Sequence, residues 1–577
     1  MIREKFGLPK VFLVYLVLAI VMTFPLAISF HGYPLFDLLD IAAAIYNFWW
    51  QYYSIFKLHS SPWFNTMINY PDGYSMALFP LYLSYGIFSW PVQALFGSPQ
   101  ALAGFFNWIS ILSFAFTGLA GFLLAREITE SEQSALLAGI LFSFMPFHFW
   151  HLPRCHTSCL ELLVLPVFFY FRMLRLKDLK AGIAFGLSLA PLFYQSPNYV
   201  IYLTMFLGLN VLYMLAFERS ELDGKWLKAL AVGMAVAAVL AGPLLFETGR
   251  EIRHSAPTTS TLQEQTRYSA NLAGLFLPGE HEQVYRGLGR FSEKLIGEHG
   301  VSGKEIFPGC ILLASGLLGI FLGRKNIKHY GFWLLSLVVF FVISLGPYLN
   351  AGGRTFFSAP LPYYYLRKIF FFFEMDRSPV RIIVLALLAL TIFSAGFFKR
   401  VGQIFTGGET AVIFNLLALL AVIDLFQAPM QISRVELPAP YQQIASERGQ
   451  FSILELPLLP DIYRYSGFFQ PYHKKALAAN LIGRKIGVGY GDDPLFFYFD
   501  EPLRFLNLDP ESRDKALEQI KAELKRRQIR YIIVYLKFVD NEQNSDIDRL
   551  ATFLDPQKKI ESYKMFRMYQ FDYGDAR

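Results

Sequence analysis

The chain has 577 residues, of which 54% are hydrophobic and only 17% are charged, and its net charge is +7. This composition excludes an ordinary soluble enzyme, because a soluble protein of this length needs far more polar surface. The charges stand between apolar runs and form no dense basic stripe, so we expect no nucleic-acid partner. We therefore expect an integral membrane protein that lies in a lipid bilayer.

Eleven apolar runs follow one another, and each approaches the roughly 20 residues that a helix needs to cross the hydrocarbon core. They cover residues 11–29, 104–125, 135–150, 157–171, 181–195, 198–217, 226–246, 309–322, 330–347, 379–398 and 411–428. A further run, 76–97, contains two prolines, and we interpret it as a juxtamembrane or re-entrant segment. The pattern predicts an α-helical polytopic membrane bundle of about 11 transmembrane helices.

The Lys and Arg residues between the runs predict the orientation. If 76–97 does not span, the basic clusters all fall on the side of the N-terminus, as the positive-inside rule requires. The clusters are Arg3–Lys10, Arg126, Arg172–Lys180, Arg219–Lys225, Arg324–Lys328 and Lys399–Arg400. We therefore expect a multi-pass protein of the plasma (inner) membrane with a cytoplasmic N-terminus. A first loop, 30–103, and a large loop, 247–308, then lie outside the cytoplasm.

The composition changes after the last apolar run, where charges of both signs become frequent. Strand-like runs occur at 451–456, 531–536 and 564–571. Residues 511–527 combine alternating charges with apolar residues at helical spacing. These features predict a transmembrane domain, 1–428, followed by a soluble extracytoplasmic α/β domain, 429–577.

The first loop carries two acids, Asp37 and Asp40, which lie three residues apart and so project from one face of a helix. A carboxylate just beyond the first span can act as a general base or bind a metal ion. The alternative is that one of the two only caps the helix predicted at 38–56. Both are candidate catalytic residues. The cofactor stays open, with a divalent cation as the candidate.

A short turn after the third run contains Arg154 and His156. Cys155, His156 and Cys159 are all metal-ligand types, but three so close together on a starting helix cannot all face one ion. An ionisable group inside the membrane or at its interface is energetically costly unless it is paired or functional. We therefore expect His156, with Arg154 near it, to form a polar wall of an active-site cavity.

Two arginines, Arg377 and Arg381, lie four residues apart at the outer end of a late span, so both can point into one cavity. A guanidinium group binds phosphate with two parallel hydrogen bonds, which suits a lipid phosphate. The alternatives are snorkelling to the interface and an ion pair with Asp376 or Glu374. Asp424, inside the last run, is a buried acid to which the sequence assigns no role.

These residues form a pattern that resembles prokaryotic membrane proteins related to the GT-C glycosyltransferases. The matching motifs, spread over nearly the whole chain, are Asp40, Trp49-Trp50, Tyr70-Pro71-Asp72-Gly73, His156 ten residues before Pro166, Tyr268-Ser269-Ala270-Asn271, Leu277-Pro278, Glu305, Arg377-x-Pro379-x-Arg381, Glu455-Leu456-Pro457, His473-Lys474-Lys475-Ala476 and Arg530-Tyr531-Ile532-Ile533-Val534. One position departs from the family pattern, because Leu39 stands where a glycine usually precedes the first-loop acid. Asp37 is therefore kept as the alternative acid.

The resemblance implies a GT-C bundle that transfers a hexosyl or pentosyl group from a polyprenyl-phosphate donor to an acceptor outside the cytoplasm. Asp40, or Asp37 in its place, would be the general base or would orient the acceptor. The substrate-binding residues would be His156, Arg154, Arg377, Arg381, Trp49, Trp50 and His473. The resemblance leaves open whether the acceptor in the cell envelope is a glycan, a lipid or a protein.

Two other functions compete with a glycosyltransferase. A carrier or flippase for a lipid-linked saccharide would also need many spans and an arginine-lined cavity. The chain lacks the paired, Gly/Pro-broken helices in matching halves that point to inverted-repeat transporters. A non-catalytic relative would instead scaffold a cell-envelope assembly through its outer domain.

Overall fold

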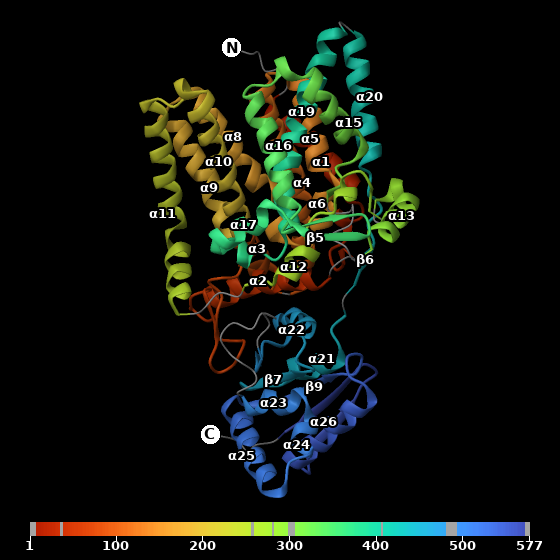
Figure 1. Ribbon diagram of the computed structural model, residues 1–577. Helices are drawn as coiled ribbons and strands as arrows, with labels where there is room; N and C mark the ends of the chain where they lie inside the picture. The colour runs from red at the N-terminus through yellow and green to blue at the C-terminus, as the bar shows by residue number, and fades with distance from the viewer. Residues whose placement is uncertain are drawn as a thin grey trace.

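The structure is a computed structural model that describes residues 7–34, 38–97, 99–254, 259–279, 282–297, 306–405, 408–434, 436–479 and 493–571. Figure 1 shows a tall helical bundle and, at one end of it, a smaller α/β region. We call the end of the bundle that faces the α/β region the proximal end, and the opposite end the distal end. The main helices of the bundle are α1 (Leu8–Met22), α4 (Ala101–Thr129), α5 (Glu132–Ser143) with the short α6 (Pro146–His151) after it, α8 (Leu160–Leu176), α9 (Leu179–Gln195), α10 (Pro197–Phe217), α11 (Gly224–His254), α15 (Cys310–Leu322), α16 (Tyr330–Ser344), α19 (Ile383–Ile404) and α20 (Gly408–Asp424).

Burial separates the centre of this bundle from its rim. Helix α4 packs against α1, α5 and α8, and α19 packs against α15, α16 and α5. The most apolar stretch of α19 is 89% buried, whereas that of α11 is only 22% buried. Exposed apolar side chains on α11, such as Val239 and Phe246, cannot face water at low cost, so they face lipid. The protein is a membrane protein.

Close helix contacts in the bundle depend on glycine. Gly182 and Gly186 lie four residues apart on α9, in the spacing that lets two membrane helices approach closely. A Cβ atom on Gly182 would come within 2.2 Å of the carbonyl oxygen of Ala229 on α11. A Cβ atom on Gly186 would meet the carbonyl oxygen of Gly233 at the same distance. Larger residues at these positions would therefore push α9 and α11 apart.

A helix lies at each of the eleven predicted spans. Among the described residues, α4, α10, α11 and the stretch Pro379–Ile404 are long and apolar enough to cross a membrane, and α1, α15 and α16 are shorter apolar helices. The count of eleven spans therefore stays a prediction. In the run 76–97, helix α3 (Leu83–Phe96) has only 14 residues and packs against α2 (Leu38–Phe56), α4 and α9. This length falls short of the roughly 20 residues of a full span.

Short elements cover the two ends of the bundle. At the proximal end, besides α2 and α3, the helices are η1 (Leu26–Ile28), α7 (Cys155–Ser158), α12 (Leu262–Arg267), η3 (Leu272–Leu275), η4 (Gln283–Tyr285), α13 (Arg286–Ile296), α17 (Pro362–Ile369), α18 (Phe371–Met375) and η6 (Pro379–Ile382). The antiparallel strand pairs there are β1 (Tyr33–Pro34) with β6 (Ile432–Ser433), β2 (Phe64–Asn65) with β3 (Tyr74–Ser75), and β4 (Tyr348–Ala351) with β5 (Arg354–Pro360). The distal connections include η2 (Arg219–Glu221) and η5 (Arg324–Asn326).

The α/β region contains a five-stranded sheet in the order β10-β11-β9-β7-β8. Its strands are β7 (Ser452–Leu456), β8 (Ala476–Leu477), β9 (Ile529–Tyr535), β10 (Lys559–Ser562) and β11 (Phe566–Gln570), and its helices are α21 (Ala439–Ser446), α22 (Pro460–His473), α23 (Pro494–Asp500), α24 (Pro502–Leu506), α25 (Pro510–Arg526) and α26 (Asn541–Leu554). Strand β7 pairs in parallel with β8 and β9, whereas β11 runs antiparallel to β9 and β10. All five residues of β7 are buried, as expected for a central strand covered on both faces.

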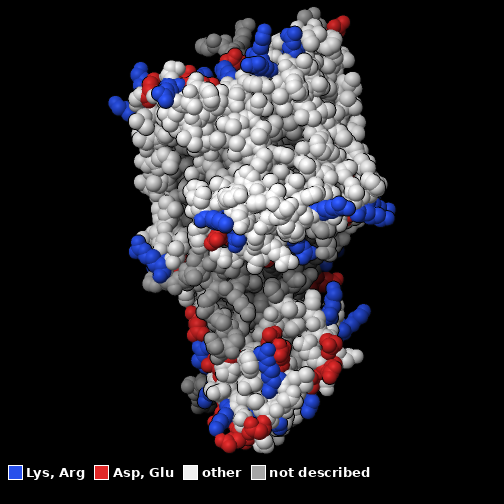
Figure 2. Space-filling model, viewed as in Figure 1, with Lys and Arg blue, Asp and Glu red and all other residues white. Residues whose placement is uncertain are grey.

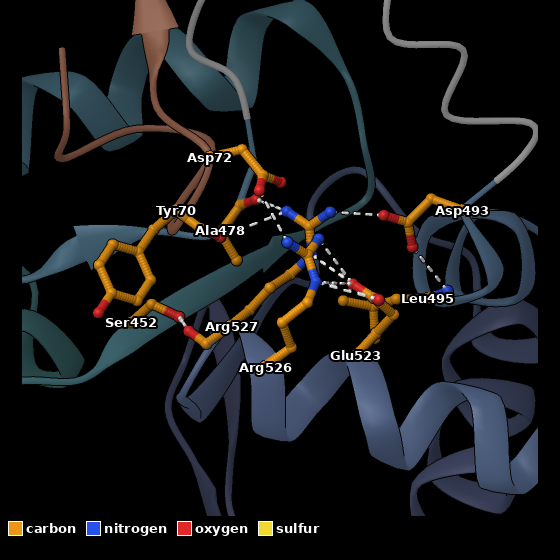
Figure 3. A network of polar contacts seen from close by, with 9 residues as sticks. All are labelled: Tyr70, Asp72, Ser452, Ala478, Asp493, Leu495, Glu523, Arg526 and Arg527. Atoms are coloured by element: carbon orange, nitrogen blue, oxygen red, sulfur yellow. Dashed lines mark hydrogen bonds and ion pairs between the residues drawn. The ribbon is translucent and has the colours of Figure 1, made fainter.

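A network of polar contacts joins the first loop to the α/β region (Figure 3). The turn Tyr70–Gly73 connects β2 to β3, and Gly73 has φ 74°, a conformation that favours glycine. Arg526 Nη1 forms an ion pair with Asp72 Oδ1 at 2.8 Å, and the Tyr70 hydroxyl donates to Gln528. The turn that the sequence motif marks is therefore a contact of the α/β region.

Arg527 lies at the centre of this network, and its side chain is only 3% exposed. It forms ion pairs with Asp493 at 2.5 Å and Glu523 at 3.2 Å. It also donates to the carbonyl oxygens of Tyr70 and Ala478. These acceptors come from the first loop and from three places in the α/β region, so this one guanidinium group holds four segments together.

Candidate functional site

Asp40 and Arg154 form an ion pair at the proximal end of the bundle. Asp40 lies in the first turn of α2, where the helix dipole favours an acid, and Arg154 directly precedes α7. The Arg154 Nε atom donates to Asp40 Oδ2 at 2.8 Å, a charge-assisted hydrogen bond. The Arg154 side chain is 18% exposed and the Asp40 side chain 24%, so a ligand can reach both. The structure thus brings together the first-loop acid and the arginine of the turn.

His156 faces helix α3. Its ring lies nearly parallel to that of Tyr82, with 6.0 Å between the ring centroids, and its Nδ1 atom is 3.4 Å from the Tyr82 hydroxyl. Tyr82 precedes α3 in a left-handed conformation with φ 57°, which fixes the direction of its side chain. The neighbouring Cys155 and Cys159 are buried free cysteines. His156 and Tyr82 therefore form a polar and aromatic wall close to Arg154.

His151 and Arg381 link the turn to the late arginine motif. His151 ends α6, is buried, and lies within electrostatic range of Arg154, His156 and Arg381. Arg381 lies in η6 near the hydroxyl groups of Tyr199 and Tyr202. Its guanidinium group makes no hydrogen bond or ion pair with any residue that the structure describes. A half-buried arginine with this donor capacity can bind an anion.

Arg377 is held differently from Arg381. Its Nη2 atom donates to the Tyr268 hydroxyl at 3.1 Å, and its guanidinium carbon lies 4.7 Å from the centre of the Tyr268 ring. The Arg377 Nε atom also lies 3.6 Å from Glu264 Oε1, and the two side chains form an exposed ion pair. The neighbouring acid Asp376 accepts a hydrogen bond from Tyr202 at 2.7 Å. Of the two predicted phosphate ligands, Arg381 is therefore the one whose donors the described protein groups leave unused.

Trp49 and Trp50 pack inside the protein. Trp50 is fully buried, and its Nε1 atom donates to the carbonyl oxygen of Pro62 at 3.0 Å. Trp49 is stacked on Tyr53 with 4.7 Å between their ring centroids. These contacts hold α2 against the rest of the first loop. A direct contact of either tryptophan with substrate stays a prediction.

His473 lies at the end of α22 in the α/β region, and α22 packs against α2. Burial lowers the pKa of His473 to about 3, so its ring is neutral at physiological pH. Its Nδ1 atom accepts a hydrogen bond from the Lys475 backbone, and its ring is stacked on Tyr441. These contacts belong to the core of the α/β region, and a role of His473 in substrate binding stays a prediction.

Glu161 is a buried acid that the sequence analysis missed. It accepts hydrogen bonds from the hydroxyl groups of Tyr85, Ser113 and Thr117, at 2.5, 2.8 and 3.3 Å. Tyr85 lies on α3, one turn from Tyr82, so Glu161 ties α3 to the bundle beside His156. Its signal in the sequence was a lone acid within the apolar run 157–171. His151 directly follows the run 135–150, in the same turn as Arg154 and His156.

Two predicted site residues lie outside the described residues. These are Asp37 and Glu305, so neither is placed relative to the Asp40–Arg154 pair. Within the described part of the chain, no three His, Cys, Asp or Glu side chains come together in a way that would hold a metal ion. The described groups offer a paired carboxylate and an arginine with unused donors on the same end of the bundle.

Two solved structures share this fold over nearly the whole chain. The arabinofuranosyltransferase AftD from Mycobacteria matches 98% of this chain at 13% identity, with a TM-score of 0.56. This chain spans only 39% of the length of that protein. An oligosaccharyltransferase from Archaeoglobus fulgidus, solved with Zn and sulfate, matches 97% of this chain and 73% of its own length, at 12% identity and a TM-score of 0.50. These likenesses show the fold, and the predicted GT-C-like fold is confirmed.

Sequence comparisons give a family for the chain. No curated protein matches it. A family model does match residues 13–426, which cover nearly all of the predicted transmembrane domain, 1–428, and include every candidate residue except His473. The chain therefore belongs to the family described as a domain of unknown function, DUF6311.

Proposed function

We propose that this protein is a membrane glycosyltransferase that moves a sugar from a polyprenyl-phosphate donor to an acceptor hydroxyl at the proximal end of the bundle. The observation that carries the proposal is the reachable Asp40–Arg154 ion pair, with Arg381 and His151 beside it. The fold adds support, because the two similar structures are named as glycosyl-transferring enzymes. The nature of the sugar and of the acceptor is left open by these observations.

In this mechanism Asp40 takes the proton of the acceptor hydroxyl. The acceptor oxygen forms a bond to the anomeric carbon of the sugar, while the bond from that carbon to the phosphate oxygen breaks. The electron pair of the broken bond leaves with the lipid phosphate. Arg154 holds the Asp40 carboxylate in a fixed direction, and a positioned general base typically speeds such a step by roughly 10²–10⁴-fold.

Arg381 would stabilise the phosphate that leaves. Negative charge grows on this group as the bond to the sugar breaks, so a nearby guanidinium group lowers the energy of the transition state. Arg377 lies four residues before Arg381 in the chain and would contribute through its remaining donors. His156 and Tyr82 would bound the pocket on the side of α3.

The proposed topology places the proximal end and the α/β region outside the cytoplasm, with a cytoplasmic N-terminus and about eleven spans. Figure 2 supports the placement of the bundle in a membrane, because a broad uncharged band separates two charged rims that both carry basic side chains. The distal connections include Arg219 and Arg324, as the positive-inside rule expects of the cytoplasmic side.

Purified protein, a panel of radiolabelled polyprenyl-phosphate sugars and crude envelope acceptors would test the proposal. Wild type is compared with Asp40→Asn and Arg381→Ala, and Asp72→Asn serves as the matched control. Asp72 is an acid of the same loop that contacts only the α/β region among the described residues. We expect transfer or slow hydrolysis of one donor, lost in both site variants and kept in the control.

Turnover that survives Asp40→Asn would contradict the proposal. A protein that turns over no donor, but binds lipid phosphate saturably through Arg381, would instead be a carrier or a scaffold. Equal losses in Asp40→Asn and Asp72→Asn would show that the loop as a whole, and not the Asp40 carboxylate, is what activity needs.

A further inference from the structure

Helix α13 stands on the flank of the bundle at the proximal end (Figure 1). Its 11 residues, Arg286–Ile296, present three distinct faces. Gly289, Ser292 and Ile296 are buried and point toward the protein. The Ser292 hydroxyl donates to the carbonyl oxygen of Gly289 and also to that of Pro278. This face attaches the helix to the rest of the molecule.

A second face of α13 is apolar and exposed. Leu288, Phe291 and Leu295 recur at the spacing of one helix stripe, and Val284 in the preceding turn continues it. These four side chains are between 45% and 57% exposed. At 100° per residue, this stripe lies roughly 100° around the helix from the buried face. Contact between water and such a stripe is unfavourable, so lipid or another apolar surface must cover this face.

The third face is basic. Arg286, Arg290 and Lys294 recur every four residues, are exposed, and form no ion pair with any residue in the described ranges. Their stripe lies roughly 120° from the buried face on its other side and roughly 135° from the apolar stripe. A helix with one attached, one apolar and one basic face suits the boundary between lipid and water.

The attachment of α13 fixes its depth. Tyr285, directly before α13, donates a hydrogen bond to Asp424 at the end of α20. Asp424 also accepts from the backbone nitrogens of Cys310 and Ile311, at 3.2 and 2.8 Å, and so caps the start of α15. Helix α20 ends at this point, and helix α15 begins there. Asp424, to which the sequence assigned no role, therefore holds α13 level with the proximal ends of two bundle helices.

The distribution of charged side chains on the surface agrees with this position of α13. In Figure 2, basic side chains stand where Figure 1 shows α13, at the border of the uncharged band. Basic side chains at such a border lie within reach of lipid phosphates, while the apolar stripe reaches the acyl chains.

We infer that α13 is an in-plane membrane helix that binds the phosphate groups of anionic phospholipids through Arg286, Arg290 and Lys294. Its apolar stripe enters the lipid, and its basic stripe lies over the headgroups. This site is separate from the Asp40–Arg154 pair and does not depend on the proposed transferase activity. A protein partner would fit less well, because it would have to cover an apolar and a basic stripe that face different directions.

Spin labels on the full chain in lipid nanodiscs test the orientation of the helix. Phe291→Cys reports on the apolar stripe and Arg286→Cys on the basic stripe, roughly 140° around the helix from Phe291. Both are made with Cys310→Ser, because Cys310 is the exposed one of the three cysteines. We expect the label at 291 to be accessible to oxygen and shielded from a water-soluble nickel chelate, and the label at 286 to show the reverse. Equal nickel accessibility, or shielding from both reagents at 291, would overturn the inference.

Lipid composition tests the basic stripe. The triple variant Arg286→Gln, Arg290→Gln, Lys294→Gln is compared with wild type in bilayers that mix phosphatidylcholine and phosphatidylglycerol. Native mass spectrometry counts the phosphatidylglycerol molecules that stay bound. We expect roughly a tenfold or greater loss of phosphatidylglycerol preference. The matched control, Lys515→Gln, Lys521→Gln, Lys525→Gln in the α/β region, removes the same charge and should keep the preference. An unchanged preference in the α13 variant would refute lipid-phosphate binding.

Discussion

Two arginines, Arg154 and Arg527, each join distant parts of the chain through an ion pair with an aspartate, but their surroundings differ. The Arg527 side chain is 3% exposed and contacts two carboxylates and two carbonyl oxygens. The Arg154 side chain and that of its partner Asp40 are 18% and 24% exposed. Arg527 is therefore enclosed by protein acceptors, whereas the Asp40–Arg154 pair stays within reach of a ligand. The difference teaches that burial, rather than residue type, separates a structural pair from a candidate reactive one.

The largest expected effect tests the enclosed arginine. Arg527→Gln leaves Asp493 and Glu523 without their buried partner, and breaking such a pair typically costs about 3–5 kcal/mol. We expect faster hydrogen exchange in β7, β9 and α25 of the full-length protein, with exchange in α4 and α19 unchanged. Arg526→Gln is the control, because that arginine is 40% exposed. Equal exchange in the two variants would remove the structural role from Arg527.

The next effect concerns an acid that has hydroxyl partners in place of an arginine. Glu455 is buried against Tyr441 and Tyr535, and burial raises its pKa to about 7. Because the folded-state pKa is above the unfolded value, the folded protein binds more protons between about pH 4.5 and 7. Stability of the α/β region should therefore fall by about 3 kcal/mol as pH rises through this window, and then level off.

Hydrogen exchange of β7 and β9 between pH 4.5 and 8, corrected for the intrinsic pH dependence of exchange, measures this fall. Glu455→Gln removes the titrating group and should flatten the curve in the same window. A wild-type curve that is already flat, or one that rises with pH, would contradict the raised pKa of Glu455.

A smaller effect is expected at the reachable pair. Arg154→Gln removes a hydrogen bond to a charged group, which is typically worth about 1.5–3 kcal/mol. Since the proposed role of that bond is to orient Asp40, turnover should fall roughly 10–100-fold, while the exchange pattern of the bundle stays the same. Unfolding of α2 or α7 without a specific loss of turnover would make this pair structural, like that of Arg527.

The smallest effect is expected for Asp72→Asn. Asp72 and Arg526 form an exposed ion pair, and such pairs are typically worth about 0.2–1 kcal/mol. Turnover should equal that of wild type, and exchange of β2 and β3 should change only slightly. A turnover defect as large as that of Asp40→Asn would show that turnover needs the first loop as a whole and not the Asp40 carboxylate in particular.

The sequence predicts the apolar helices and the GT-C-like fold because both depend on local patterns. The runs that predict helices are read from composition alone, and the motifs around Asp40 and Arg381 keep short, fixed spacings. The helix expected at 38–56 is also found, as α2 at Leu38–Phe56. The pairing of Asp40 with Arg154 could not be read in the same way, since the two residues are 114 positions apart.

The tryptophans and Asp72 show a second limit of sequence reasoning. A motif shared with a family marks both reactive residues and residues that hold the fold, and its letters do not distinguish the two. The structure buries Trp50 against Pro62 and directs Asp72 toward Arg526. Glu161 was passed over because it is a lone ionisable residue inside an apolar run, and His151 directly follows such a run. Only tertiary packing brings the two residues beside the site.

The most direct test of the central claim is a double-mutant cycle on turnover with Asp40→Asn, Arg154→Gln and the double variant. If Arg154 acts by orienting Asp40, the double variant should be no slower than Asp40→Asn alone. Losses that multiply, or an Asp40→Asn variant that keeps wild-type turnover, would contradict the assignment of this ion pair as the reactive site.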